Sequence, residues 1–578
     1  MPPLWTPRRS EQASSGPPPP KEAIELFISF YEGTNFQDTL ESFVKLCEIL
    51  NFPFGGPFSV FYPKLKRALK DHLPYKYKEI WKILDKKAAQ KPYGANSVCE
   101  NKKTLVVGCG PCGLRTAVET QLLGSQTVIL ERRGNFSRNN VLKIWKFLID
   151  DLKMLGAKKL FGSFCSGAIN HIGIRTLQLL LSKIILMMGV KVLVCTFDDL
   201  IEPTDSSRWK AKVTPSGEFM DNFEFDFLII ASGKKVAIEG FNRRSLDAKL
   251  SIAITANFQN KGTSEEKATR QISGISRQYD QQFFKAMVDE FGISLENLVY
   301  YRGETHYFVM TALKKSLLDK GVLIQDEDDR KLLLAPTNVN KEALYACAKD
   351  AALFATKSFS KVLPHTDFQL NSRGQPDVAI FDFTNLYSAK NSCKIRVSNG
   401  CTLLMSIVGD SLLEPFWPEG TGCARGFLSC MDAAWMFRQW CVARKNPMDI
   451  LAERENIYKM LTQTSDGGQG GNLKPNYKSY TTDPKTRYRM VPKTNDDMKQ
   501  KILTLYETDN SEEYQYLSDM FLKGKYFEED KHKGFLKRVR HALKEKKTLS
   551  FTTTSRVISK FKKKKRNPPA AEAATELS

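Results

Sequence analysis

The stretch TLVVGCGPCGLRTAVETQLLGSQTVILE, from Thr104 to Glu131, is the most informative part of this sequence. A short apolar run leads into the glycines Gly108, Gly110 and Gly113, and a helical pattern and a second β-rich run follow. The first glycine permits a tight turn, the second lets the backbone approach a pyrophosphate, and the third permits close packing of helix on strand. The N-terminus of the helix would offer unpaired N–H groups to a phosphate. The pattern predicts a dinucleotide-binding βαβ unit.

An acidic residue, Glu131, closes this unit at the end of the second β-rich run. Its carboxylate can bind a ribose hydroxyl. A glycine pattern on its own is a weak signal, and a chance glycine turn is the alternative. Here the strand before the glycines, the helix after them and the acidic residue agree, which favours a bound adenine dinucleotide.

Composition limits the remaining possibilities. The chain has 578 residues, of which 42% are hydrophobic, so it can bury a large core. Its formal net charge of +22 indicates a polyanionic or acidic partner and does not choose between nucleic acid, a membrane surface and an acidic protein. Twelve cysteines are dispersed along the chain and no signal-peptide pattern precedes them. We therefore expect free thiols in a reducing compartment, and we expect no metal site.

Composition and periodicity divide the chain into four regions. We expect a disordered leader over 1–20, a helical preface over 21–100, a catalytic body over 101–489, and a separate basic, partly helical tail with a disordered end over 490–578. Within the body, about 249–323 is more β-like and predicts a smaller sheet subdomain. The stretch 463–489 is rich in Gly, Asn, Ser, Thr and Pro and is interpreted as a linker.

The longest apolar stretch runs from Thr176 to Cys195 and is interrupted by charged residues and a glycine. It divides into a helix that ends at Gly189 and a strand from Val190 to Val194. We therefore expect no integral membrane span.

A second pattern indicates which dinucleotide binds. The run Ser406-Ile407-Val408 ends in Gly409-Asp410, and a glycine-opened helix follows. This arrangement suits FAD, because the carboxylate can bind the ribityl chain while the helix N-terminus faces the electron-rich edge of the flavin. A nicotinamide cofactor would not need this second set of contacts. An ordinary turn is the alternative for Gly409-Asp410 taken alone.

Several longer blocks resemble the flavin monooxygenase domain of the MICAL family. They are Cys112–Arg115, Phe136–Leu142, Leu155–Lys159, Ile252–Phe258, Thr305–Ala312 and Gly409–Gly426. The resemblance covers roughly Lys21 to Arg489. It implies an α/β fold similar to that of p-hydroxybenzoate hydroxylase, with an FAD-binding doubly wound domain and an inserted smaller α/β domain. We expect a monomer, a divergent member of the family without the calponin-homology and LIM domains that follow in many relatives.

The resemblance also implies a set of site residues. The FAD contacts of the family fall on Cys112, Glu131, Arg132, Arg133, Arg138, Asn139, Asn140 and Asp410. Arginines suit a pyrophosphate, and Asn140 offers a donor and an acceptor to the flavin or the ribityl chain, although each of these residues could instead be a solvated surface group. Trp417 would lie beside the isoalloxazine and Tyr307 would form an opposite wall, with two buried core aromatics as the alternative.

The activity that the resemblance implies uses FAD and NADPH. NADPH reduces FAD, reaction with O2 follows, and oxygen passes to a methionine sulfur of F-actin, or H2O2 is released when no substrate intervenes. The protein would orient the cofactor, exclude water and admit a protruding methionine. Oxidation to the sulfoxide makes this apolar side chain polar, which would break a filament contact. A basic surface suits acidic actin, and we do not expect nucleic acid to be the partner.

One departure from the family bears on this activity. Where the family has Gly-Ala-Asp-Gly after a strand, this chain has Ile230-Ala231-Ser232-Gly233, so that Ser232 replaces the aspartate. In this class of flavoprotein the segment is associated with both the FAD side and the NADPH side. The alternative to an enzyme is therefore a degenerate flavin-binding homologue that acts as a non-catalytic actin- or partner-binding module.

Three further signals have two interpretations each. Lys560–Arg566 is a basic cluster that suits an import receptor, and it also suits actin, nucleic acid or acidic lipid as a general electrostatic patch, or is merely solvated. We accordingly expect the protein at the cytoskeleton in the cytoplasm, with the nucleus as a second location. Arg175 reaches either a cofactor phosphate or a carboxylate at the edge of the core. Cys109 and Cys112 form a CxxC pattern, but they lie inside the phosphate loop, so a redox or metal role is set aside.

Overall fold

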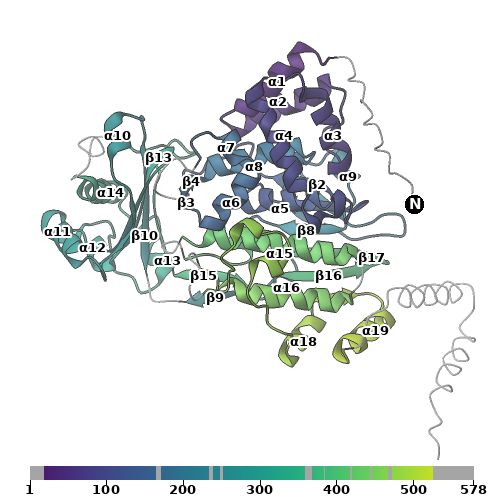
Figure 1. Ribbon diagram of the computed structural model, residues 1–578. Helices are drawn as coiled ribbons and strands as arrows, with labels where there is room; N and C mark the ends of the chain where they lie inside the picture. Colours follow the sequence, from purple (N-terminus) through teal and green to yellow (C-terminus); the bar gives the residue numbers. More distant parts are fainter. Residues whose placement is uncertain are drawn as a thin grey trace, which may run out of the picture.

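The structure is a computed structural model that describes residues 18–164, 171–233, 238–247, 251–357, 367–382, 384–416, 420–442, 445–465 and 471–524. Two sheets lie side by side, with an N-terminal group of helices packed over the larger one (Figure 1). No helix in these ranges is both long and apolar enough to cross a membrane.

The larger sheet has seven strands in the order β18-β16-β17-β8-β1-β2-β5. Its strands are β1 (Lys103–Val107), β2 (Gln126–Glu131), β5 (Lys191–Val194), β8 (Phe227–Ile230), β16 (Cys393–Ser398), β17 (Cys401–Ile407) and β18 (Tyr506–Thr508). All neighbouring pairs are parallel except β16 and β17. The central strands are apolar on both faces, as a sheet covered by helices requires.

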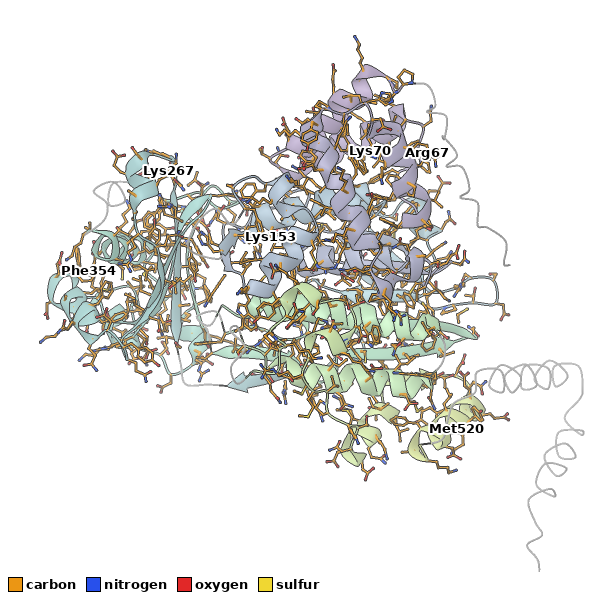
Figure 2. All side chains as sticks on the ribbon, in the orientation of Figure 1. Arg67, Lys70, Lys153, Lys267, Phe354 and Met520 are labelled. Carbon is orange, nitrogen blue, oxygen red and sulfur yellow. The ribbon has the colours of Figure 1, made fainter. Side chains whose placement is uncertain are left out.

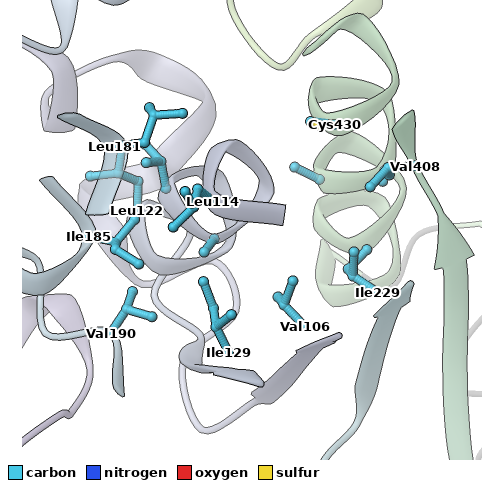
Figure 3. Close-up of a cluster of buried hydrophobic side chains, with 14 of the residues drawn as sticks. Val106, Leu114, Leu122, Ile129, Leu181, Ile185, Val190, Ile229, Val408 and Cys430 are labelled. Atoms are coloured by element: carbon cyan, nitrogen blue, oxygen red, sulfur yellow. The ribbon is translucent and has the colours of Figure 1, made fainter. Parts of the chain in front are cut away.

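Helices cover this sheet because their apolar faces pack against the apolar side chains of its strands. The main ones are α5 (Pro111–Leu122), α6 (Lys146–Met154), α8 (Ile174–Met187), α15 (Gly422–Val442) and α16 (Pro447–Leu461). In Figure 3, Leu114 of α5 and Leu181 of α8 lie over Val106 and Ile129 of the sheet. The predicted division of the apolar stretch 176–195 into helix and strand is confirmed, since α8 is followed by β5.

The second sheet is antiparallel, in the order β11-β12-β13-β10-β14. Its strands are β10 (Ile252–Gln259), β11 (Ile272–Ser276), β12 (Leu295–Arg302), β13 (Thr305–Ala312) and β14 (Val378–Asp382), and its helices are α10 (Ser264–Ala268), α11 (Gln281–Phe291), α12 (Lys314–Asp319), α13 (Arg330–Leu333) and α14 (Lys341–Thr356). It has a core of its own, to which Phe354 of α14 belongs (Figure 2). The chain enters this unit after β8 and returns to the larger sheet at β16, so the predicted α/β fold with an inserted smaller domain is confirmed. The unit extends past the expected end at 323, because β14 pairs with β10.

Smaller elements connect these parts. Three two-stranded pairs are β3 (Val141–Lys143) with β4 (His171–Gly173), β6 (Thr196–Ile201) with β7 (Lys210–Thr214), and β9 (Arg243–Asp247) with β15 (Asn385–Ala389). Short helices are α7 (Ala157–Leu160), α9 (Glu218–Asp221), η3 (Gly409–Ser411), η5 (Tyr477–Ser479) and α17 (Pro484–Arg487). The pair β3–β4 lies between the larger sheet and the second one (Figure 1).

The N-terminal helices are α1 (Lys21–Glu32), α2 (Phe36–Ile49), α3 (Phe58–Leu69) and α4 (Tyr75–Ala88), with η1 (Lys91–Asn96) after them. A buried charge cluster joins them to the larger sheet. Lys87 of α4 lies 3.7 Å from both Glu119 of α5 and Asp151 of α6. Arg115 donates to Asp151 through two bonds of 2.8 and 2.9 Å. Opposite charges that are buried together hold the three helices in one arrangement.

Two expectations about the C-terminal part are wrong. The stretch interpreted as a linker packs into the core where it is described, with Tyr477, Tyr480 and Tyr488 buried and Arg487 bonded to Asp432 at 2.7 Å. The chain after residue 489 is not separate either. β18 extends the larger sheet beside β16, and α18 (Asp496–Leu503) and α19 (Ser511–Leu522) pack on α16. Glycine and asparagine indicate loops, but the buried tyrosines among them anchor this loop to the core.

Candidate cofactor site

The candidate site lies where three parallel strands end at one edge of the larger sheet. In the register of the sheet, Ile230 of β8 pairs with Val107 of β1 on one side and with Ile407 of β17 on the other. The residues that follow these strand ends begin the glycine loop, the Ser232 segment and the Gly409–Asp410 turn. Ligands of open α/β sheets bind at this edge.

The three glycines of the first loop have different surroundings. A Cβ on Gly113 would lie 1.9 Å from the carbonyl oxygen of Gly108, and a Cβ on Gly108, where φ is +107°, would lie 2.7 Å from that of Ala231. These two positions therefore require glycine for packing. A Cβ on Gly110 would meet its nearest atom only at 3.9 Å. The backbone at Gly110 and the N-terminus of α5 are thus open to a ligand, as the sequence pattern predicts.

Side chains from two other elements hold this loop in place. Glu131 at the end of β2 accepts hydrogen bonds from the backbone N–H of Cys109 at 2.9 Å and from that of Arg133 at 3.0 Å. Gln178 of α8 donates to the carbonyl oxygen of Cys109 at 2.9 Å. Sequence reasoning missed Gln178, whose one signal is an amide on an otherwise apolar helix face. Glu131 shapes the loop, and its contact to a ribose stays a prediction.

Cys112 connects the glycine loop to the Gly409–Asp410 turn. A Cβ on Gly409 would lie 2.8 Å from the Cys112 Sγ, and a Cβ on Gly426 of α15 would lie 2.6 Å from it. The thiol of Cys430 donates to the carbonyl oxygen of Cys112 at 3.1 Å. Contact with Cys430, together with burial, raises the pKa of the Cys112 thiol well above its ordinary value. The thiol is therefore uncharged, and its role here is packing. The exposed Asp410 follows Gly409 in η3.

The Ser232 segment lies between the other two loops. The carbonyl oxygen of Gly233 accepts hydrogen bonds from Ser411 of η3 at 2.9 Å and from Arg243 at 3.1 Å. The hydroxyl of Ser232 is buried and has no hydrogen-bond partner in the described part of the chain. Ser232, where the resemblance implies an aspartate, thus lies at the strand-end edge.

The segment Arg138–Asn140 faces the second sheet. Asn139 donates from Nδ2 to Asp377 at 2.7 Å, and Asn140 donates to the Tyr307 hydroxyl at 3.1 Å. Burial raises the pKa of Tyr307, so its hydroxyl stays neutral. The Oδ1 of Asn139 is buried and has no partner among the described residues. Tyr307 and the predicted cofactor segment are therefore in direct contact.

The remaining predicted residues have different surroundings. Arg132 and Arg138 are exposed, and Arg133 is half-buried with its Nε 3.3 Å from Glu131. Arg175 donates to Glu304 at 3.0 Å, so of its two interpretations the structure has the carboxylate pair. Trp417 lies outside the described residues, and its predicted place beside the isoalloxazine stays a prediction.

These surroundings suit a dinucleotide. The open backbone at Gly110 can receive a pyrophosphate, and the helix N-terminus behind it favours negative charge. Ser232 Oγ and Asn139 Oδ1 are buried and have no partner among the residues that the structure describes, which costs about 1–3 kcal/mol per group unless a bound molecule supplies the missing hydrogen bond. In the ranges that the structure describes, no group of His, Cys, Asp or Glu is arranged to bind a metal.

Comparison with known proteins adds an independent observation. The family model "Mical, Rossman domain" matches residues 250–382, which form the second sheet and its helices. The protein named [F-actin]-monooxygenase mical1 of Danio rerio is 47% identical over 489 residues, which are 84% of this chain and 39% of the relative. Protein-methionine sulfoxide oxidase mical3a of the same species is 47% identical over 80% of this chain and 23% of its own length.

A human relative agrees with these two. [F-actin]-monooxygenase MICAL3 of Homo sapiens is 46% identical over 469 residues, which are 80% of this chain and 23% of the relative. The chain thus spans well under half the length of these relatives. Identity at this level over four fifths of the chain reaches far beyond the glycine loop. The chain belongs to the MICAL family.

Proposed function

We propose that the protein is an FAD-dependent, NADPH-using monooxygenase that oxidises methionine of F-actin to the sulfoxide and promotes filament disassembly, or releases H2O2 when no substrate intervenes. The observation that carries this proposal is the meeting of three loops at the ends of β1, β8 and β17. The backbone at Gly110 is open there, and two buried polar atoms have no partner within the described ranges. The names of the relatives support the choice of substrate.

The residues of the site would hold FAD from three sides. The backbone at Gly110 and the N-terminus of α5 would bind the pyrophosphate, with the guanidinium groups of Arg133 and Arg138 as charged donors. Asp410 would bind the ribityl hydroxyls. Asn139 and Ser232 would each use the polar atom that lacks a partner. When bound, FAD would accept electrons from NADPH and pass an oxygen atom from O2 to the sulfur.

The second sheet would form the wall of the reaction chamber. Tyr307 is buried at 3% exposure and is fixed by its bond to Asn140, so it presents a rigid ring at the junction of the two sheets. A rigid apolar wall excludes water from a reactive centre. Trp417 would form the other wall, leaving space for a methionine side chain between them. The sulfoxide that results is polar and would weaken an apolar filament contact.

Partner and location follow from the same proposal. F-actin would be bound through the basic surface that the net charge of +22 provides. The protein would act as a monomer at the cytoskeleton in the cytoplasm. An import receptor would bind the basic cluster Lys560–Arg566, which lies outside the described residues, and bring part of the protein to the nucleus.

The direct test is mass spectrometry of actin after incubation with the FAD-loaded protein and NADPH. Methionine sulfoxide should form at specific positions of the filament, and catalase should not prevent it if oxygen passes directly. Sulfoxide that disappears with catalase would instead indicate released H2O2. Actin that stays unmodified while the protein retains bound FAD would contradict the proposed activity.

A second candidate function is a non-catalytic module that retains the fold and binds flavin and actin. The observation that favours it is Ser232, whose buried hydroxyl has no partner in the part of the chain that the structure describes. The resemblance implies an aspartate at this position. Ser232→Asp should raise the rate of NADPH oxidation if the missing carboxylate limits the reaction. Ser232→Ala is the matched control for folding, because the Ser232 hydroxyl has no partner among the described residues without cofactor, so its loss should leave the fold of the apoprotein intact. An unchanged rate of NADPH oxidation in flavin-loaded Ser232→Asp protein would mean that the missing carboxylate does not limit the reaction.

A further inference from the structure

Asp377 connects the second sheet to the predicted cofactor segment. It lies directly before β14, at the end of a hairpin that an isolated bridge between Leu370 and Pro376 closes. The backbone N–H of Asp377 donates to Gln369 at 2.7 Å, and its carbonyl oxygen accepts from Asn257 of β10 at 3.0 Å. Because the backbone of Asp377 is hydrogen-bonded on both sides, the position from which its side chain extends is fixed.

The carboxylate then collects two amide donors on one oxygen. Oδ2 accepts from Asn139 Nδ2 at 2.7 Å and from Asn257 Nδ2 at 2.9 Å. The Oδ1 of Asn257 accepts from the Thr305 hydroxyl of β13 at 2.7 Å. The side chains of Asn139, Asn257 and Thr305 are at most 8% exposed. Hydrogen bonds to a carboxylate are stronger than neutral ones, so the Asn139–Asp377 bond is a strong polar contact between the predicted cofactor segment and the second sheet.

The charge of Asp377 decides which end of the Asn139 amide faces it. An ionised carboxylate can only accept, so Asn139 must present its NH2 group to it. The amide oxygen, Oδ1, then points away, and it is the atom that is buried without a partner in the described part of the chain. A group that satisfies this oxygen must be a hydrogen-bond donor. FAD carries such donors in its ribityl hydroxyls and its ring N–H.

We propose that Asp377 is a positioning residue that orients Asn139 so that Asn139 Oδ1 accepts a hydrogen bond from an O–H or N–H of the bound cofactor. This inference rests on the proposed function and deepens it, because it assigns the second sheet a part in cofactor binding. Asp377 acts through Asn139 and need not touch the cofactor. A purely structural Asp377 would fix the second sheet through Asn257 without changing cofactor affinity.

The test exchanges the two side chains of the pair. Asn139→Asp places two carboxylates face to face and should weaken FAD binding. Adding Asp377→Asn removes this repulsion, because the new amide can turn its NH2 group toward Asp at 139, at the expense of the bond that Oδ2 of Asp377 accepts from Asn257. The other oxygen at 139 is then again an acceptor for the cofactor. The exchanged pair should therefore bind FAD more tightly than Asn139→Asp alone, whereas two independent structural losses would make it bind FAD more weakly than either single variant.

The measurements are FAD titration of the apoprotein, followed by fluorescence quenching, and hydrogen exchange of the segment 132–145 without cofactor. Asp377→Asn alone should weaken FAD binding about tenfold, the size expected for one charge-assisted hydrogen bond. It should also speed exchange of that segment, because the charge that orders Asn139 is lost. Asp367→Asn, an exposed carboxylate ten positions away in the same hairpin region, is the control and should change neither quantity.

Three results would overturn the proposal. Unchanged exchange in Asp377→Asn would mean that the carboxylate does not order the segment. Faster exchange with unchanged FAD affinity would leave Asp377 a purely structural residue. An exchanged pair that binds FAD worse than either single variant would show two independent structural losses. If the parent protein binds no FAD, the proposed function fails instead, and the exchange experiment still decides whether Asp377 orders Asn139.

Discussion

Single atoms decide whether the first loop can bind a dinucleotide. Gly113 and Gly110 are three positions apart in the same pattern, yet the first has no room for a side chain and the second has open space. The sequence pattern assigns the two glycines different roles, close packing for Gly113 and backbone access for Gly110. The surroundings of each glycine in the folded loop match these roles.

This difference gives a matched pair of variants. Gly113→Ala should destabilise the apoprotein by about 3 kcal/mol, because the added methyl group overlaps the carbonyl oxygen of Gly108. Gly110→Ala should leave the stability of the apoprotein nearly unchanged and still weaken FAD binding, because the methyl group occupies the face predicted for the pyrophosphate. Urea unfolding and FAD titration of both variants measure these effects. Equal loss of stability in both would contradict the account of the loop.

Most of the site could be predicted at this scale, and the unpredicted part has a clear cause. The glycine loop, Glu131 and the Gly409–Asp410 turn are local patterns, and the fold brings them to one edge. Gln178, Asn257 and Asp377 could not be recognised, because their roles depend on hydrogen bonds between segments far apart in the chain. Glu131 was recognised, but its bonds to the loop backbone were not.

Between elements, buried polar groups hold the N-terminal helices on the larger sheet. Lys183 of α8 donates to the carbonyl oxygens of Tyr31 at 2.6 Å and Gly33 at 2.7 Å, at the end of α1. Lys183 is 4% exposed. A helix end with its last carbonyls bonded to a buried lysine is fixed in place, so α1 and α8 move as one body.

Lys183 predicts a dependence of stability on pH. Burial lowers its pKa in the folded protein from 10.5 to about 8. Between these values the unfolded chain binds a proton that the folded protein does not, so this residue makes the free energy of unfolding rise with pH, by at most about 1.4 kcal/mol per pH unit. Its contribution is lost as the pH falls through 8. Urea unfolding at a series of pH values gives the free energy of unfolding as a function of pH. Between pH 8 and 10.5 this free energy should rise more steeply for the parent than for Lys183→Met. Parallel curves for the two proteins would contradict the lowered pKa of Lys183.

The buried charge cluster predicts a second effect at this scale. The charges of Arg115 and Lys87 lower the pKa of Asp151 although burial opposes this, so the carboxylate is ionised. Asp151→Ala should cost about 3 kcal/mol or more, because it leaves buried Arg115 without its main partner. Glu79→Ala is the control, since Glu79 forms an exposed ion pair with Lys159 between α4 and α7. Glu79→Ala should change the midpoint of urea denaturation little. A similar loss of stability in Glu79→Ala and Asp151→Ala would mean that burial does not determine the contribution of these ion pairs.

For the whole molecule, the sequence predicts the arrangement of two sheets but not which strands form their ends. Alternating strands and helices and the β-like middle follow from local periodicity. The assignment of β14 and β18 does not, because these short strands join their sheets only through partners far back in the chain, β10 and β16. The stretch 471–489 looks like a loop by composition and is one, yet its tyrosines bury it.

This arrangement predicts how the chain tolerates truncation. Ending the protein after Arg489 removes β18, α18 and α19 and exposes apolar surface that Ile502, Tyr506 and Leu517 cover. Such a protein should aggregate or melt several degrees lower than a protein ending at residue 524, which keeps these three elements. Thermal melting and light scattering of both compare the two ends. Equal behaviour would contradict the structural role of residues 490–524.

Flavin binding and NADPH turnover of the purified full-length protein give the decisive test of the proposed function. The visible absorption spectrum of the protein reports bound flavin, and NADPH consumption is then followed with and without F-actin. We expect a flavin band and turnover that F-actin stimulates. Bound flavin without turnover would favour the non-catalytic module and direct attention to Ser232, and a correctly folded protein that binds no flavin would contradict the account.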